Sequence, residues 1–466
     1  MPDYEPVLLA NIEKPDSHTR AVYEAGGGYR TLRRVLREMS PADVVERIRS
    51  SNLRGRGGAG FPTGLKWSFL PEDHPGPVYM CVNADESEPG TFCNRVQMEL
   101  DPHQVIEGII LSCYATRSAT GYIYLRFEYP LAFQRLQGAI DECYEAGYLG
   151  KNILGSPFSL DIFIHRGAGA YICGEETGLI ESLEGKRAWP RIKPPFPAVE
   201  GLFRKPTVVN NVETLTCVLH ILDRGVEWFK SIGVPPDPKN PRDPGSYGPK
   251  LYGISGHVNR PGLYELPLGI PARQLIDEYG GGVWKGRRPK AVVPGGLSTG
   301  VMTAAELDTP MDFNGPLRVG CLGLGTAGMI VMDETYSMID FLHNSCRFFA
   351  HESCGQCTPC REGTHWAVAM LERIKAGRGR LRDLELLLEI GDSIGIIPGS
   401  TICGLADGAA WPIKTVIRKF RDEFEDYIRR TNPAGYALAG PSEALVPSGD
   451  GEHNRQPRQV ATGWGR

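Results

Sequence analysis

An alternation of strand-like and helix-like segments over residues 1–245 constrains the fold of this 466-residue chain more than any other feature. In chain order, the apolar patterns predict segments at residues 42–48 (helix), 77–83 (strand), 105–115 (helix), 121–126 (strand), 131–146 (helix) and 160–165 (strand). Strands separated by helices of this length are typical of an α/β layer with a mostly parallel sheet. We therefore expect an N-terminal α/β domain over residues 1–245.

A stretch rich in Pro, Gly and Asp, residues 235–249, breaks this pattern and predicts a domain boundary. The following patterns predict a small α+β domain over residues 246–335, with elements at residues 251–255 (strand), 262–266 (strand), 272–279 (helix) and 290–294 (strand). The fold class that we expect is thus α/β in the first domain and α+β in the second.

Amphipathic helices follow from Tyr336 onward, and they predict a helical bundle over residues 336–430. One apolar face runs through Ala367 and Leu371, and the last one extends from Ile413 to Ile428. Residues 431–466 are rich in Gly, Pro, Ser and charge, so we expect a disordered tail.

Composition argues against several classes of protein. The formal net charge is -4 and the basic runs are short, so the chain lacks the electrostatic signature of a nucleic-acid-binding protein. No stretch approaches the ~20 apolar residues that cross a bilayer, and membrane association would therefore depend on partners. Because the N-terminal residues show no secretory signal, we expect a reducing compartment that preserves free thiols.

Four of the twelve cysteines have the spacing of an iron–sulfur ligand set. Cys354, Cys357 and Cys360 follow the pattern C-x2-C-x2-C, and Cys403 lies in a later turn-rich segment. Three neighbouring thiolates can bind three corners of a cubane cluster and leave the fourth corner to a remote ligand. Bacterial ferredoxins place another cysteine where Thr364 stands, so Cys403 is the candidate fourth ligand. Zinc and unligated or disulfide-bonded thiols are the alternatives.

A glycine-rich stretch, residues 53–67, predicts a phosphate-binding loop. Its turn-permissive residues leave backbone N–H groups free to approach a phosphate, which Arg54, Arg56 and Lys66 would neutralise. Residues 55–60 match G-x-G-x-x-G, but the preceding segment is helical, so the context of a Rossmann site is missing.

A second match to this motif, Gly323 to Gly328, follows a strand-like segment at residues 317–322. It leads into another strand-like segment, residues 329–332, rather than into a helix. We therefore interpret it as a tight turn and not as a nucleotide site.

Several polar segments indicate a nucleotide site larger than one mononucleotide requires. Residues 83–90 directly follow a strand, and their acids and amide suit a ribityl chain or ribose, although capping of the next helix explains them equally well. Residues 166–178 lead from a strand through glycines toward a helix, residues 193–197 form a stiff polyproline segment, and residues 208–214 contain an Asn pair. The set fits a flavin mononucleotide with a dinucleotide stacked beside it.

These motifs resemble, in the same order, those of the NADH-binding, flavin-carrying subunit of bacterial respiratory complex I, the NADH:quinone oxidoreductase. The resemblance covers about residues 15 to 430, and the C-terminal tail lies outside it. It implies that the middle domain is β-grasp-like and that the helical domain carries the first [4Fe–4S] cluster of an electron-transfer chain.

The resemblance also implies roles for individual residues. FMN would be held by Gly55, Gly57, Gly58, Lys66, Asn83, Asp85, Glu86, Tyr171, Gly174, Glu175, Asn210 and Asn211. NADH would be bound by Phe61, Phe69, Glu88, Glu176, Lys193 and Phe196, with the three phenylalanines around the adenine and Glu175 also near the nicotinamide half. Cys354, Cys357, Cys360 and Cys403 would hold the cluster. No acid–base residue is implied, and Glu88, Glu176 and Lys66 would support hydride transfer to FMN electrostatically.

The function implied by the resemblance is oxidation of NADH and transfer of single electrons toward quinone. The implied partners are a small [2Fe–2S] subunit and a large multi-cluster subunit, with the chain on the cytoplasmic side of the inner membrane. Flavoproteins of NAD-reducing hydrogenases and NAD-dependent formate dehydrogenases share these motifs, so a diaphorase subunit of such an enzyme is an alternative. A non-enzymatic zinc-bound scaffold is a second one.

Overall fold

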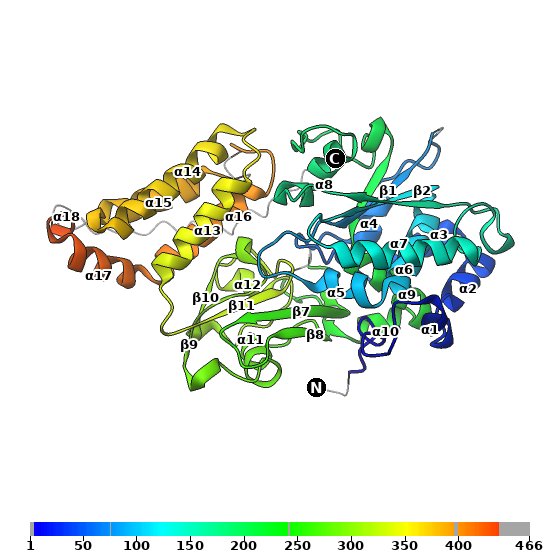
Figure 1. Cartoon of the computed structure of the whole chain (residues 1–466), viewed down its shortest axis with the longest axis horizontal. Helices are drawn as coiled ribbons and strands as arrows, with labels where there is room; N and C mark the ends of the chain where they lie inside the picture. Colours follow the sequence, from blue (N-terminus) through cyan, green and yellow to red (C-terminus); the bar gives the residue numbers. More distant parts are fainter. Residues whose placement is uncertain (1–3, 75, 241–242, 396–398, 438–466) are drawn as a thin grey trace. The chain divides into compact units, whose positions relative to one another are not determined.

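The computed structural model describes residues 4–74, 76–240, 243–395 and 399–437 (Figure 1). The chain divides into two compact units, residues 1–336 and 337–466. The described strands lie in the first unit, and the second is helical (Figure 1). The predicted fold class, α/β followed by a helical bundle, is confirmed.

A four-stranded parallel sheet organises the first part of unit 1. Its strands are ordered β3-β2-β1-β4, and every neighbouring pair is parallel. The strands are β1 (Tyr79–Ala84), β2 (Thr120–Leu125), β3 (Asp161–Arg166) and β4 (Thr207–Asn211). The first three confirm the predicted strands, whereas β4 was not predicted because it is a short apolar run that leads directly into a helix.

Helices cover both faces of this sheet. Side chains of α6, α7 and α9 share one apolar core with alternate strand residues such as Val82 and Ile123. The opposite face, with Cys81 and Tyr124, packs against α8. The helices of this region are α1 (Arg20–Ala25), α2 (Arg30–Glu38), α3 (Pro41–Ser50), α4 (Thr63–Trp67), α5 (Cys93–Leu100), α6 (Pro102–Thr116), α7 (Pro130–Glu145), α8 (Glu176–Leu183), α9 (Val212–Arg224) and α10 (Val226–Lys230).

A five-stranded mixed sheet forms the middle of the chain. Its order is β10-β9-β11-β7-β8, with β7 and β11 parallel and the other pairs antiparallel. The elements are β7 (Pro249–Gly256), β8 (Gly262–Pro267), α11 (Ala272–Gln274) with a π-helical turn η4 (Leu275–Tyr279), β9 (Pro289–Val293), β10 (Met302–Thr303), α12 (Gly315–Arg318) and β11 (Gly328–Asp333). The predicted strands and helix of this region are confirmed.

One prediction for the middle region is wrong. Residues 317–322 were expected to be strand-like, but the chain forms the short helix α12 and then a turn. Pro316 occupies the first turn of that helix, where its missing N–H costs nothing, and Gly320 has a φ of +78° that ends the element.

The predicted boundary segment, residues 235–249, begins after one short strand and contains a second. These strands, β5 (Gly233–Val234) and β6 (Ser246–Tyr247), pair with each other in an antiparallel manner. Both lie within the first compact unit. The division into domains at residue 245 therefore stays a prediction.

Unit 2 is a bundle in which α13 packs against α14 and α16, and α15 packs against α16. Its helices are α13 (Met338–Glu352), α14 (Thr358–Arg373), α15 (Leu381–Ser393), α16 (Leu405–Lys419), α17 (Arg421–Thr431) and α18 (Pro433–Ala437). The apolar face expected from Ile413 to Ile428 is divided between α16 and α17. Phe420 leaves the helical conformation, and Asp422 and Glu423 then place negative charge in the first turn of α17, where it favours a new helix start.

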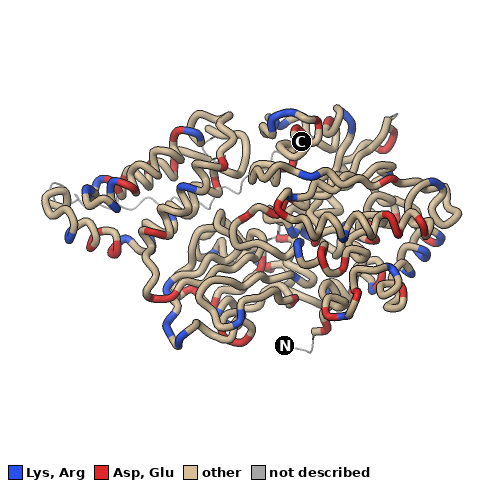
Figure 2. Tube along the Cα trace, viewed as in Figure 1, with Lys and Arg blue, Asp and Glu red and all other residues tan. Residues whose placement is uncertain are grey.

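The helix α18 lies where the sequence predicted the beginning of a disordered tail. The remainder of that predicted tail, residues 438–466, lies outside the described residues. In the described part of the chain, basic and acidic residues are interspersed along the trace (Figure 2).

Candidate functional site

The parallel sheet has a topological switch point between β1 and β4. Strands β2 and β3 extend the sheet on one side of β1, whereas β4 pairs on the other side. Asn83 and Asn211, at the carboxyl ends of β1 and β4, are register partners. Ligands of open α/β sheets bind outside the carboxyl ends of strands at such a point. The predicted segments after β1 and at the end of β4 therefore meet where a ligand is expected.

The glycine loop, residues 55–60, approaches this switch point closely. Gly58 and Gly60 have φ values of +129° and +64°, which favour glycine. A Cβ atom on Gly57 would lie 3.0 Å from Cβ of Asn211. The loop backbone thus lies against the end of β4, and a side chain at position 57 would force Asn211 or the loop to shift.

Two of the three cations predicted to face a phosphate are used elsewhere. Nε of Arg54 donates to the Gly60 carbonyl (2.8 Å), and its guanidinium lies 4.1 Å from the Phe313 ring centroid. Arg56 is only 1% exposed and lies near the rings of Phe229 and Phe313. Both arginines therefore anchor the glycine loop to surrounding aromatic side chains, a role that depends on residues distant in sequence.

Lys66 belongs to a cluster of ion pairs with the two acids that begin α8. Its Nζ lies 2.8 Å from Oε2 of Glu176, and Nζ of Lys193 lies 2.6 Å from the other oxygen of Glu176 and 3.2 Å from Oε1 of Glu175. Burial alone would raise the pKa of Glu176, but the charges of Lys66 and Lys193 outweigh it and lower the pKa to about 2. Four of the predicted site residues thus form one contiguous charged cluster.

Asn83 and Asp85 organise the loop that follows β1. Nδ2 of Asn83 donates to the Gly174 carbonyl (2.8 Å), and its Oδ1 accepts from the Asp85 amide (3.1 Å). A Cβ on Gly174 would lie 3.5 Å from Oδ2 of Asp85. The structure therefore brings these three predicted flavin residues together.

Glu88 joins the α/β region to the middle region. Its Oε2 accepts from the Tyr171 hydroxyl (2.6 Å), and its Oε1 accepts from the Ser298 amide (2.7 Å). Burial raises the pKa of Glu88, although these hydrogen bonds partly oppose the shift. Tyr171 and Glu88, both predicted site residues, are therefore in direct contact. The sequence offered no signal for Ser298, which takes part through its backbone amide and its side chain.

Glu86 contacts a different set of residues from the other predicted flavin-binding residues. Its carboxylate accepts from the amides of Asn94 (2.6 Å) and Arg95 (2.8 Å) at the start of α5, and from the Tyr129 hydroxyl (3.2 Å). Burial raises the pKa of Glu86 to about 7 despite these hydrogen bonds. The helix-capping interpretation, left open in the sequence, describes the contacts of this residue.

The two asparagines at the end of β4 have separate partners. Oδ1 of Asn210 accepts from the Trp67 indole N–H (2.9 Å), and Nδ2 of Asn211 donates to Oδ1 of Asn94 (2.6 Å). Asn211 also caps α9, because its Oδ1 accepts from the Glu213 amide (3.0 Å). These contacts hold the strand end rigidly beside the glycine loop.

The three phenylalanines predicted around an adenine lie on two segments. The rings of Phe61 and Phe69, which flank α4, are tilted by 45° with centroids 6.3 Å apart. Phe196 is half-buried in the loop that follows Lys193. Phe61 and Phe69 are therefore neighbours, and the adenine sandwich stays a prediction.

The second glycine motif forms a turn, as interpreted from the sequence, and the turn pairs with the first motif. The Ala327 amide donates to the Leu324 carbonyl (3.1 Å), and Gly325 has a φ of +57°. Gly325 and Gly58 form an antiparallel bridge. The middle region thus supports the glycine loop directly, a contact that no local pattern could reveal.

The four candidate cluster ligands lie in unit 2, around the start of two helices. Cys354 and Cys357 lie between α13 and α14, Cys360 lies in the first turn of α14, and Cys403 precedes α16. Burial raises the pKa of the Cys360 thiol, a hydrogen bond with Ser353 opposes the shift, and the nearby Cys354 and Cys357 raise it further.

Comparison with known proteins places the three regions of the chain in one family. Residues 48–220 match a Nuo51 FMN-binding domain, residues 251–301 an SLBB domain, and residues 340–427 an NADH-ubiquinone oxidoreductase-F iron-sulfur binding region. An F subunit of the NADH-quinone oxidoreductase of Rhizobium meliloti is 54% identical over 425 residues, which cover 91% of this chain and 98% of that protein. This chain belongs to the family of NADH-quinone oxidoreductase F subunits.

Other members of the family are similar over comparable lengths. The F subunit of Streptomyces coelicolor is 48% identical, with 91% of each chain covered, and the F subunit of Escherichia coli is 46% identical, with 88% of this chain and 89% of that one covered. A solved NAD+-reducing [NiFe]-hydrogenase in the air-oxidized state matches with a TM-score of 0.76 and 34% identity over 91% of this chain and 67% of that chain. The three F subunits are thus more similar in sequence than the hydrogenase.

Family membership confirms the predicted FMN and [4Fe–4S] cofactors, and the residues fit FMN. The glycine loop provides backbone where a Cβ would collide, and Asn83 and Asp85 provide polar groups for a hydroxyl-rich chain. Lys66 reaches β4, where its Nζ donates to the Val209 carbonyl (2.9 Å).

The donor set of four cysteines suits an iron–sulfur cluster, whose irons are bound by thiolates. Among the residues that the structure describes, no three His, Cys, Asp or Glu side chains surround one metal position. A structural zinc ion needs four ligands at about 2.0–2.3 Å from one point, whereas cubane thiolates each bind a different iron and stand farther apart. The match of residues 340–427 to an iron-sulfur binding region, together with family membership, replaces the zinc-scaffold alternative. None of the helices in the described ranges combines the length and hydropathy needed to span a membrane.

Proposed function

We propose that this chain oxidises NADH as the flavin subunit of an NADH-quinone oxidoreductase complex and passes electrons toward quinone through an iron–sulfur cluster. The observation that carries the proposal is the convergence at one switch point of three features: the glycine loop, the polar end of β1 and the cluster of Lys66, Glu176 and Lys193. They supply backbone for a phosphate, hydrogen-bonding groups for a ribityl chain, and charges for a dinucleotide.

The cofactor side of the site would be formed mainly by the ends of β1 and β4 and by the glycine loop. When bound, FMN links the two-electron chemistry of a hydride donor to one-electron acceptors. The residues that would hold it are Gly55, Gly57, Gly58, Lys66, Asn83, Asp85, Tyr171, Gly174, Glu175, Asn210 and Asn211. Glu86 would act indirectly, since its carboxylate caps α5 and thereby fixes the loop that carries Asp85.

On the substrate side, the chain would orient NADH rather than exchange protons with it. Phe61, Phe69 and Phe196 would contact the adenine, while Glu88, Glu176 and Lys193 would lie along the riboses and the nicotinamide half. Because Lys66 and Lys193 face Glu175 and Glu176, the cluster is close to neutral and offers directed hydrogen bonds rather than a net positive field.

Unit 2 would hold the [4Fe–4S] cluster through Cys354, Cys357, Cys360 and Cys403. Electrons would leave this cluster for a small [2Fe–2S] subunit and a large multi-cluster subunit of the complex. The chain would then lie on the cytoplasmic side of the inner membrane and be attached through those partners. The relatives named as subunits of an NADH-quinone oxidoreductase support this assembly.

A ferricyanide assay on the full-length chain, purified with its partners, tests the proposed reaction. Each NADH oxidised to NAD+ releases one proton and reduces two ferricyanide ions. Ferricyanide should therefore be consumed at twice the rate of NADH. Lys193→Ala should slow the reaction at low NADH, whereas Arg204→Gln, at an exposed pair with Glu200, should leave it unchanged. A preparation that contains flavin and iron but does not consume NADH would refute the proposal.

A diaphorase subunit of an NAD-reducing hydrogenase is the second candidate, and the similarity to the solved hydrogenase supports it. An NAD-dependent formate dehydrogenase would have a related partner set. Purification of the native complex and identification of its subunits separates these candidates. A [NiFe] subunit in stoichiometric amount would favour the hydrogenase, and quinone reductase subunits would favour the main proposal.

A further inference from the structure

We propose that Arg191 is a positioning residue for NADH, and this inference rests on the proposed function. Arg191 closes the base of the loop formed by residues 191–201, here called the Pro-rich loop. The loop carries Lys193 and Phe196, which are assigned to the nucleotide, while Arg191 itself binds protein groups only in the contacts described below.

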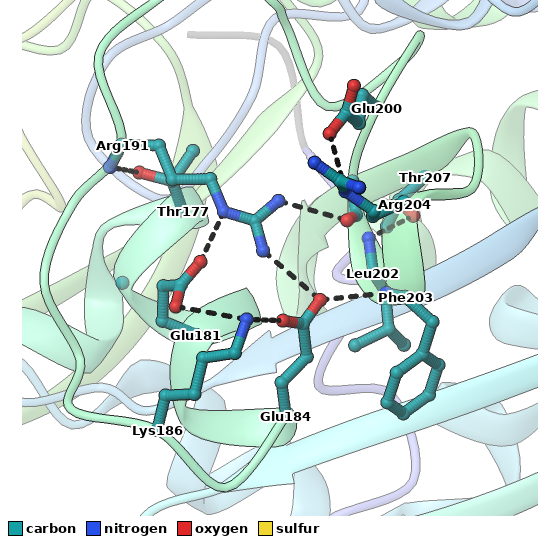
Figure 3. Close-up of polar contacts among 12 residues, drawn as sticks. Thr177, Glu181, Glu184, Lys186, Arg191, Glu200, Leu202, Phe203, Arg204 and Thr207 are labelled. Carbon is teal, nitrogen blue, oxygen red and sulfur yellow. Dashed lines mark hydrogen bonds and ion pairs between the residues drawn. The ribbon is translucent and has the colours of Figure 1, made fainter.

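Both ends of the Pro-rich loop are joined through Arg191 (Figure 3). Its backbone N–H donates to Oγ1 of Thr177 on α8 (2.9 Å), which fixes the beginning of the loop. Its Nη1 donates to the carbonyl of Gly201 (2.9 Å), which fixes the end. One residue therefore closes the loop and attaches it to α8.

Two carboxylates hold the guanidinium in this orientation. Nε lies 2.5 Å from Oε1 of Glu181, and Nη2 lies 3.1 Å from Oε1 of Glu184. Glu184 also accepts from the amide of Phe203 (2.8 Å), just beyond the loop (Figure 3). A planar guanidinium can donate in three directions at once, and a lysine ammonium on a flexible stem cannot reproduce this geometry.

The same helix holds the functional part of the loop. Glu175, the N-cap of α8, and Glu176, its first residue, bind Lys193, whereas Glu181 and Glu184 at the other end bind Arg191. The short helix α8 thus acts as a rigid spacer between two attachment points. If the side-chain contacts of Arg191 are lost, the loop keeps the backbone bond of residue 191 to Thr177, the ion pairs of Lys193 and the bond of Thr207 to Pro197, but its end at Gly201 is no longer tied to its beginning.

Packing alone holds the Pro-rich loop weakly. Ile192 is 71% exposed and Val199 is 63% exposed, and the buried apolar residues of the loop are Pro197 and Ala198 near its end, so its first half has little packing. Beyond the base, the amide of Thr207 donates to the carbonyl of Pro197 (2.8 Å). Segments with few buried contacts open locally at low free-energy cost, so Arg191 is expected to be the main restraint.

A positioning role predicts a particular kinetic pattern. Lys193 and Phe196 would contact NADH equally in the ground and transition states, so their displacement raises KM and leaves kcat nearly unchanged. The FMN-binding residues on β1, β4 and the glycine loop do not touch the Pro-rich loop base in the described contacts. Flavin content should therefore stay normal.

Arg191→Met and Arg191→Lys in the full-length chain, purified with its partners, test the proposal. We expect KM for NADH to rise about tenfold, which corresponds to about 1.4 kcal/mol, with kcat within about twofold and flavin absorption unchanged. Hydrogen–deuterium exchange of a peptide spanning residues 192–200 should accelerate in both variants. The matched control is Lys186→Met, because Lys186 binds the same two glutamates but is 58% exposed and lies outside the loop.

The outcomes separate this inference from the proposed function. A normal KM in both Arg191 variants, or a raised KM without faster exchange, would overturn it, as would an equal effect of Lys186→Met. If the wild-type chain fails to oxidise NADH, the proposed function fails, and the exchange experiment still decides whether Arg191 holds the loop. If Arg191→Met does not fold, Arg191→Lys retains the charge and carries both measurements.

Discussion

Glu176 is the residue whose surroundings most directly suggest a choice between nucleotides. It lies between the ammonium groups of Lys66 and Lys193. Glu176→Ala would leave both lysines without this partner and remove a charge that repels a 2′-phosphate. We expect kcat/KM for NADPH relative to NADH to increase by roughly ten- to a hundredfold, or about 1–3 kcal/mol, mainly through KM for NADPH. Steady-state kinetics with both nucleotides measures this ratio.

Glu200→Gln provides the control for this experiment, because Glu200 is paired only with the exposed Arg204 among the described ion pairs. Its specificity ratio should equal that of the wild type. An unchanged ratio in Glu176→Ala would show that the Glu176 carboxylate does not face the ribose.

The same carboxylate predicts sensitivity to acid. Burial opposes ionisation of Glu176, yet Lys66 and Lys193 lower its pKa from 4.5 to about 2 in the folded chain. Since the folded pKa is below the unfolded one, this contribution is complete above about pH 4.5 and is lost as the pH falls toward about 2. The free energy of unfolding of the wild type should therefore fall more steeply than that of Glu176→Gln between pH 5 and 3. Urea titrations at several pH values measure both, and parallel curves would contradict the pKa shift.

At the residue scale, sequence predicts which side chains gather but not how each is used. Asn83, Asp85 and Gly174 meet as expected because strand ends of a parallel sheet converge. Arg56 and Glu86 could not be assigned in this way, since their contacts are with aromatic rings and helix amides fixed only by the folded chain. When a charged residue stands in a functional motif, we can therefore predict that it lies near the site. We cannot predict from the motif alone that it contacts the ligand.

At the scale of elements, the structure of the glycine loop predicts the effect of a substitution that its sequence motif alone does not. The steric reason for glycine at position 57 is its close approach to Asn211, where a Cβ would lie 3.0 Å from another carbon. Gly57→Val should push the loop away from the end of β4. We expect the purified variant to lack the flavin absorption bands while its iron content stays normal.

Gly138→Val is the matched control, because a Cβ on Gly138, an exposed position of α7, meets no atom within 4 Å. It should retain flavin at wild-type stoichiometry with little change in stability, since valine has a somewhat higher helix propensity than glycine. Normal flavin content in Gly57→Val would show that the cofactor does not depend on this approach.

Elements with clear periodicity were predictable, and their interruptions were not. The strands β1 to β3 and the helices α6 and α7 follow apolar patterns that local physics already specifies. The end of α16 at Phe420 is a local break within a continuous apolar pattern, and the pairing of Gly58 with Gly325 depends on a contact between distant segments. Neither feature can be identified from the apolar periodicity of the sequence.

At the scale of the whole molecule, flavin and cluster ligands belong to different compact units. The glycine loop and strand ends lie in residues 1–336, and the four cysteines lie in residues 337–466. Loss of one cofactor should therefore leave the binding of the other intact. Cys357→Ala should abolish the low-temperature paramagnetic signal of the reduced cluster, since a cubane that loses a thiolate ligand is not retained in its native form.

Flavin content of Cys357→Ala should remain at the wild-type level, as measured by visible absorption after extraction. Cys346→Ala is the matched control, because Cys346 is a buried cysteine of α13 in the same unit whose pKa burial raises to about 12, as expected for an inert thiol. That variant should keep the full signal. A persistent signal in Cys357→Ala would show that Cys357 is not a ligand, whereas simultaneous loss of flavin would show that the two units depend on each other for folding.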